Sequence, residues 1–135
     1  MAQKSNSYSK IEVAIELMLC AKNLYQQENH VCATILAGAA QQIVRDLCKA
    51  NQIEPTIKTL AEHQCRDGTE LHDFISFTYN KLKHANREQN DVVVGEDEAR
   101  VLIELAATDL IRLKVNPNQS IVEILNFVKH NINVV

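Results

Sequence analysis

Three polar side chains recur along one face of a predicted helix in the middle of the chain. Within residues 71–87, the amide of Asn80, the imidazole of His84 and the guanidinium of Arg87 follow one another at intervals of four and three residues. That spacing places all three on one side of a helix. A histidine can act as general base or general acid near neutral pH. Asn80, one turn before it, can orient the imidazole or a substrate.

Basic and aromatic side chains flank these three residues. Lys83 and Arg87 can bind a phosphate group, and Phe77 lies beside His84 on the same side of the predicted helix. The whole set would suit metal-free cleavage of RNA, in which a base deprotonates the 2′-hydroxyl and a cation stabilises the phosphorane. The same residues also fit an ordinary solvated helix face, and their spacing does not separate the two interpretations.

The composition predicts an all-α domain without a broadly basic surface. The 135 residues suit one hydrophobic core, and 46% of them are hydrophobic. With 3 glycines and 2 prolines, the chain lacks the turn residues that all-β folds require. The net charge of −3 argues against binding to duplex DNA, which demands a basic face.

Apolar periodicity predicts a single domain over residues 1–135, with residues 1–6 disordered. We interpret the pattern as a bundle of four main helices with one or two short ones. Two S-x-x-E capping boxes, Ser9 with Glu12 and Ser120 with Glu123, mark helix starts. The helices are expected over about 7–27, 30–51, 55–64, 71–86, 96–114 and from 120 onward.

The first predicted helix is apolar on two sides, which predicts either a central helix or a helix at a dimer seam. Its second stripe consists of Val13, Leu17, Cys20 and Leu24.

In the second predicted helix, Gly38 lies among alanines, where a glycine costs about 1 kcal/mol relative to alanine. The usual compensation is the close approach of another backbone, so a tight helix crossing is expected there. A ligand packed against this flat spot is the alternative. Gln41 and Gln42 follow, and they are read as a solvated edge of the helix.

Cysteine usage and hydropathy predict a cytoplasmic protein with reduced thiols. Cys20, Cys32, Cys48 and Cys65 form no C-x-x-C pair. The first ten residues lack the apolar segment of a signal peptide, and no apolar stretch is long enough to cross a bilayer. His63, Cys65 and His72 match no zinc spacing, so no metal and no cofactor are expected.

Two segments resemble the HEPN family of helical domains. Asn80-Lys81-Leu82-Lys83-His84-Ala85, followed by a polar connection and the helix that starts EDEARVLIELAATDL, is similar to the C-terminal half of these domains. The earlier LAGAAQQIV resembles the small-residue helix of uncharacterised bacterial and archaeal HEPN-like proteins. The resemblance covers about residues 10–115. It implies a helical bundle that pairs as a homodimer, and often a metal-independent endoribonuclease.

The resemblance also assigns roles to individual residues. His84 matches the catalytic histidine of the family motif, and Asn80 matches the polar residue before it. The motif arginine falls on Tyr79, which carries no fixed positive charge. Tyr79, Lys83 and Arg87 are then the expected substrate-binding residues, with Phe77 at the interface. Gln41 and Gln42 stand where the relatives have glutamates, and Asn86 stands where they have aspartate.

Two functions therefore remain open from the sequence. The first is a metal-independent endoribonuclease or RNA-binding protein of a defence or toxin–antitoxin type system, with Tyr79 in place of the motif arginine. The second is a non-catalytic dimeric module that binds a partner protein through the Phe77/His84 face. The expected partners are a second copy of the chain, RNA or a cognate protein, and neither a membrane nor duplex DNA.

Overall fold

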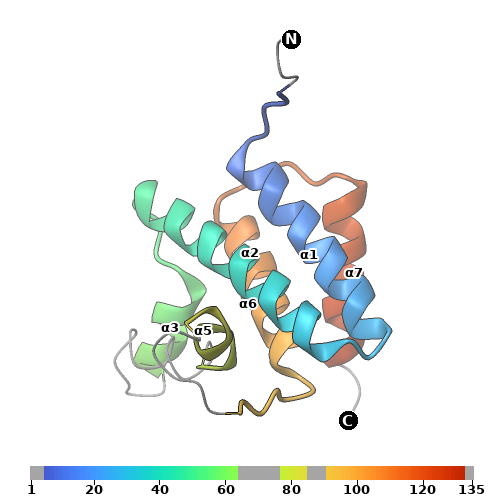
Figure 1. The fold of residues 1–135 in the computed structure, drawn as a ribbon. Helices are drawn as coiled ribbons and strands as arrows, with labels where there is room; N and C mark the ends of the chain where they lie inside the picture. Colours follow the sequence, from blue (N-terminus) through green and yellow to red (C-terminus); the bar gives the residue numbers. More distant parts are fainter. Residues whose placement is uncertain (1–4, 64–76, 85–90, 133–135) are drawn as a thin grey trace.

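The part of the chain that the structure describes is all-helical, which confirms the predicted fold class. The computed structural model describes residues 5–63, 77–84 and 91–132, and no strand occurs among them. The helices, labelled as in Figure 1, are α1 (Lys10–Gln26), α2 (His30–Ala50), α3 (Thr56–His63), α5 (Phe77–Lys83), α6 (Glu98–Arg112) and α7 (Gln119–Ile132).

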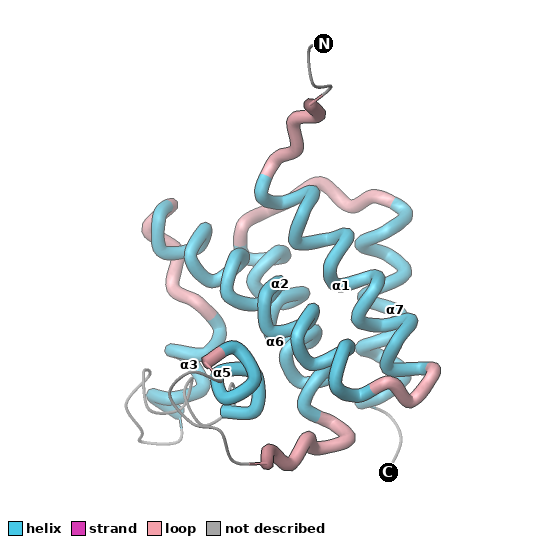
Figure 2. Tube along the Cα trace, viewed as in Figure 1, coloured by secondary structure: helices cyan, strands magenta, loops and turns pink. Residues whose placement is uncertain are grey.

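Four of these helices form the bundle, and two short ones lie against it. α2 packs against both α1 and α6, and α7 packs against α1 and α6. The short helix α5 lies on α2, and α3 lies on α6. Figures 1 and 2 show α3 and α5 together on the opposite side of α2 from α7. The tube in Figure 2 also shows that the described connections are loops and turns.

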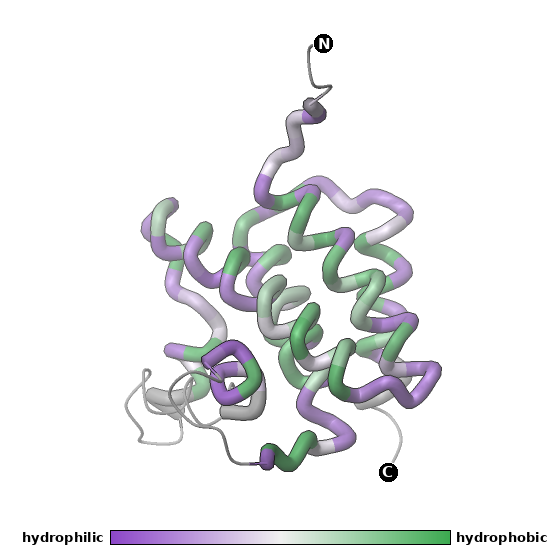
Figure 3. Tube along the Cα trace, in the orientation of Figure 1, coloured by the Kyte–Doolittle hydropathy of each residue, from purple (hydrophilic) through white to green (hydrophobic). Residues whose placement is uncertain are grey.

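Small side chains bring the first two helices close together. Ala14 and Ala21 of α1, and Ala33, Ala37 and Ala40 of α2, are all fully buried. Alanines permit a short distance between helix axes because little side-chain volume separates the backbones. The larger core residues come mainly from α6 and α7. Figure 3 shows the hydrophilic connection between α1 and α2 in purple and the apolar middle of these helices in green.

Helix α1 starts as predicted, whereas α7 starts at a different cap. The Ser9 hydroxyl accepts the Glu12 amide hydrogen at 3.0 Å, and the Glu12 carboxylate accepts that of Ser9 at 3.2 Å. At α7, the predicted box of Ser120 and Glu123 is wrong. Asn118 Oδ1 accepts the amide hydrogen of Ile121 at 2.9 Å instead, which makes Asn118 the cap.

The carboxylate of Glu123 has a different partner. The Lys22 ammonium, only 8% exposed, lies 2.6 Å from Glu123 Oε1. This ion pair joins α1 to α7, and it satisfies a lysine that would otherwise be costly to bury.

The second apolar stripe of α1 is not buried in the single chain, so α1 is not a central helix. Val13 and Cys20 are exposed, and Leu17 and Leu24 are half-buried. The other side of α1 packs fully, with Met18 completely covered. The predicted alternative, a helix at a dimer seam, stays a prediction.

A buried carboxylate of α6 anchors the short helix α3. Asp109 Oδ1 accepts hydrogen bonds from the amide of Thr56 at 2.7 Å and from its hydroxyl at 2.6 Å. Asp109 is fully buried. Through these two hydrogen bonds, a side chain distant in sequence caps the first turn of α3. Beside it, the Cys48 thiol donates to the Asp109 carbonyl at 3.8 Å. Burial, with a smaller effect of Asp109, raises the pKa of Cys48 to about 11.

We expect Asp109→Ala to destabilise the fold by about 2 kcal/mol, because it leaves two donors of the half-buried Thr56 without their acceptor. Urea unfolding followed by circular dichroism measures this loss. Asp109→Asn keeps one acceptor and is expected to lose less, and Asp91→Ala, at an exposed position, is the control. An unfolding midpoint for Asp109→Ala equal to that of the Asp91→Ala protein would contradict the cap.

Candidate functional site

The ring of Tyr79 lies directly on the backbone of α2 at Gly38. A Cβ atom added at Gly38 would stand 2.4, 2.5 and 2.8 Å from three carbons of the Tyr79 ring. Contacts this short do not occur between real side chains, so any residue larger than glycine would displace the ring. The predicted close approach at Gly38 is therefore confirmed, and the group nearest the glycine is an aromatic side chain of the neighbouring helix α5 and not a second backbone.

Lys83 lies one helical turn after Tyr79 and reaches the same part of α2. Its Nζ atom is 5.1 Å from the centroid of the Tyr79 ring, within the range of a cation–π contact. The same atom donates to Gln42 Oε1 at 3.4 Å. Burial raises the pKa of the Tyr79 phenol above its ordinary value, so this ring stays neutral at physiological pH. A neutral ring and an ammonium thus lie together against this part of α2.

The two glutamines after the small-residue tract have different environments. Gln41 is 1% exposed, so its interpretation as part of a solvated edge is wrong. Gln42 is half-buried at the surface where α5 lies on α2.

Asn80 and His84 face a different side of α5 from Tyr79. Both side chains are half-buried, and the His84 amide donates to the Asn80 carbonyl at 3.1 Å, so they lie one turn apart as predicted. At 100° per residue, however, His84 stands about 140° around the helix from Tyr79. Arg87 lies outside the described residues. Of Phe77 the structure describes the backbone, which begins α5.

A surface depression of about 270 Å³ opens next to Tyr79. Its lining combines apolar groups from α2 with an ammonium from the start of α1, an amide and a carboxylate. We call it the α2–α5 depression, and its lining residues are Lys10, Ala39, Gln42, Ile43, Asp46 and Tyr79.

Sequence reasoning missed two charged members of this depression. Lys10 opens α1, and Asp46 lies near the end of α2. The antiparallel α1–α2 pair brings them to one place, and no motif links them in the sequence. Gly38 was the one sequence signal for this surface, because a glycine inside a helix marks a point of close approach by another group.

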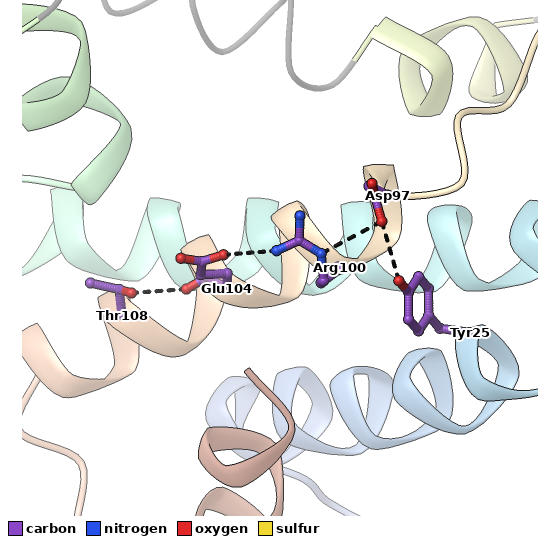
Figure 4. Close-up of polar contacts among 5 residues, drawn as sticks. All are labelled: Tyr25, Asp97, Arg100, Glu104 and Thr108. Atoms are coloured by element: carbon purple, nitrogen blue, oxygen red, sulfur yellow. Dashed lines mark hydrogen bonds and ion pairs between the residues drawn. The ribbon is translucent and has the colours of Figure 1, made fainter. Parts of the chain in front are cut away.

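A second polar cluster lies at the other end of the α1–α2 pair. The Tyr25 hydroxyl donates to Asp97 Oδ1 at 3.3 Å, and Arg100 lies between Asp97 at 3.7 Å and Glu104 at 3.5 Å (Figure 4). Burial first, and then Asp97, raise the pKa of Tyr25. The cluster runs along α6 and joins its start to the end of α1, so its evident role is to hold these helices together.

The described part of the chain holds neither a metal-binding cluster nor a membrane-spanning helix. None of its groups of three or more His, Cys, Asp or Glu residues could hold a metal ion. None of its helices is both long and apolar enough to cross a membrane.

No family model, curated protein or solved structure matches this chain. A family assignment therefore stays a proposal that rests on the residues themselves.

We expect Gly38→Ala to destabilise the protein by about 1–3 kcal/mol, because the new methyl group displaces the Tyr79 ring. In a Tyr79→Ala background the sign should reverse, since alanine then gains about 1 kcal/mol of helix propensity over glycine. Urea unfolding of the four proteins of this double-mutant cycle measures both values.

Gly95→Ala is the matched control, because its Cβ would meet a flexible Glu98 side chain at 3.1 Å. A Gly38→Ala protein more stable than the wild type would show that the ring does not lie on Gly38.

Proposed function

We propose that this chain is a HEPN-like helical protein that binds single-stranded RNA on the surface shared by α5 and α2. The observation that carries the proposal is the gathering of an aromatic ring, an ammonium and an amide, contributed by Tyr79, Lys83 and Gln42. Single-stranded RNA is held by side chains of these types, which contact base faces, phosphates and base edges. The family resemblance supplies the context of a defence or toxin–antitoxin type system.

Binding rather than cleavage is the proposal because helical spacing puts the expected catalytic histidine and the residue at the motif-arginine position on different sides of the helix. Tyr79, at the position of the family arginine, is neutral and packed on α2. His84 faces another side of the helix, about 140° away. A cleaving site needs the histidine and a charge-stabilising donor around the same phosphate.

The overall charge agrees with a local site for a single strand. A net charge of −3 offers no continuous basic face for a duplex. Lys10 nevertheless lines the α2–α5 depression, and Lys83 donates to Gln42 of the same lining.

We expect Lys83→Ala to weaken binding of an oligouridylate of about twelve nucleotides. Loss of one phosphate contact should lower the slope of log K against log salt by about 0.7. Fluorescence anisotropy of the labelled strand at several salt concentrations measures both effects. Lys129→Ala, an exposed lysine on α7, makes the same change of net charge away from the site. Equal slopes for Lys83→Ala and the wild type would contradict the proposed surface.

The same purified protein and RNA also test the nuclease alternative. With EDTA present, we expect the RNA to stay intact over hours. Cleavage that disappears in His84→Ala, while the variant keeps the wild-type circular dichroism spectrum, would replace binding by catalysis at His84 and Asn80.

A second candidate function, a non-catalytic dimeric interaction module, is favoured by the outer stripe of α1. Val13 is 36% exposed, and Leu17 and Leu24 are half-buried in the single chain. Apolar side chains uncovered along one helix face are typical of surfaces that pair.

Light scattering on purified protein tests this candidate. If the chain is a homodimer through the α1 stripe, Val13→Asp should give a monomer, because a charge cannot be buried there unpaired. If the interface lies on the Phe77/His84 face instead, Phe77→Asp should give the monomer and Val13→Asp should leave the dimer intact. A wild-type chain that is monomeric at high concentration would contradict both versions of the module.

A further inference from the structure

The α2–α5 depression has the size and the mixed lining of a site for one nucleobase. Its volume of about 270 Å³ falls just below the roughly 300–1,000 Å³ of pockets that hold drug-sized ligands. Ala39 and Ile43 supply apolar contact for a flat ring, and Tyr79 supplies an aromatic wall. Three polar side chains, those of Lys10, Gln42 and Asp46, complete the lining. The amide of Gln42 and the carboxylate of Asp46 can select among the bases.

Gln42 presents its amide nitrogen rather than its oxygen as the available group. An ammonium can only donate, so the Gln42 oxygen is the atom that faces Lys83 Nζ at 3.4 Å. The Nε2 atom, with two hydrogens, points away from that contact because it sits on the opposite arm of the amide. With its oxygen engaged by Lys83, Gln42 keeps the two hydrogens of Nε2 to donate to a molecule in the depression.

Asp46 is the complementary acceptor. Its side chain is 59% exposed, and Oδ1 lies 3.6 Å from Arg45 Nε, which leaves most of its acceptor capacity for another molecule. A carboxylate accepts two parallel hydrogen bonds from neighbouring donors.

Of the four RNA bases, guanine matches this pair of side chains best. Its Watson–Crick edge carries two adjacent donors, N1–H and the N2 amino group, followed by the acceptor O6. Adenine and uracil each present a single donor group next to an acceptor that would face the carboxylate. Cytosine presents one amino donor, also with an acceptor beside it. We infer that the α2–α5 depression binds an unpaired guanine of a single strand, with Asp46 and Gln42 on its Watson–Crick edge. This inference rests on the proposed RNA binding.

The basic groups around the depression fit the backbone of that nucleotide. Lys10 lines it from α1, and Lys83 contacts two of its lining residues from α5. Phosphate contacts position a strand without reading its sequence, whereas contacts to a base edge specify the base. The two lysines should therefore set overall affinity, and Asp46 should set the preference for guanine.

The experiment compares oligouridylates of about twelve nucleotides that carry a single guanosine, adenosine or cytidine near the middle. By fluorescence anisotropy, we expect the wild type to bind the guanosine strand about tenfold more tightly than plain oligouridylate, as one bidentate base contact allows. Asp46→Asn should abolish that preference, so that the variant binds the guanosine strand no more tightly than it binds plain oligouridylate.

Glu16→Gln is the matched control, because it makes the same change of net charge at an exposed position of α1. It should keep the guanosine preference. Equal affinity of the wild type for all four strands, or a guanosine preference that survives in Asp46→Asn, would overturn the guanine site and leave RNA binding intact. Failure of the wild type to bind any strand would overturn both the site and the proposed function.

Discussion

The contact of the Tyr79 ring with Gly38 is the constraint on which the proposed site depends. A short helix such as α5 has little stability of its own, since isolated helices of fewer than about 12–15 residues are marginal. With seven residues, it needs tertiary contacts, and the Tyr79 ring on Gly38 is one such contact with α2. Once the ring is placed, Lys83 follows one turn later and reaches Gln42. The contact between α5 and α2 thereby offsets the free-energy cost of placing Gly38 inside a helix.

The bundle below this contact is held by two different kinds of packing. Alanines between α1 and α2 give close approach with few large side chains, while Leu102, Ile103 and Leu110 of α6 supply bulk at the centre. Buried polar groups then fix the attachments around the bundle. Lys22 pairs with Glu123 between α1 and α7, and Asp109 caps α3 from α6. The α2–α5 depression is therefore built largely on the packed helices α1 and α2, with Tyr79 added from α5. Helices position the groups of a site more precisely than loops do.

Local signals in the sequence predicted the helices well, and long-range partners could not be predicted. The capping box at Ser9 was visible because both of its members lie within one turn. The same pattern at Ser120 was misleading, since Glu123 is drawn to Lys22, 101 residues away. Gly38 was recognised as a point of approach, but the approaching group comes from Tyr79, far along the chain. Lys10 and Asp46 belong to the candidate site only because the α1–α2 pair is antiparallel, which no spacing rule encodes.

The most direct test of the central contact is the proton chemical shift of the Gly38 Hα atoms. The ring current of an aromatic side chain in contact with a glycine displaces the resonances of its α protons, so we expect the Gly38 Hα shifts to lie well away from the ordinary glycine position. The shift should return to that position in Tyr79→Leu, which keeps the helix but removes the ring current. Ordinary Gly38 Hα shifts in the folded wild type would contradict the account, because the ring would then not lie on α2 and α5 would not be held where the site requires it.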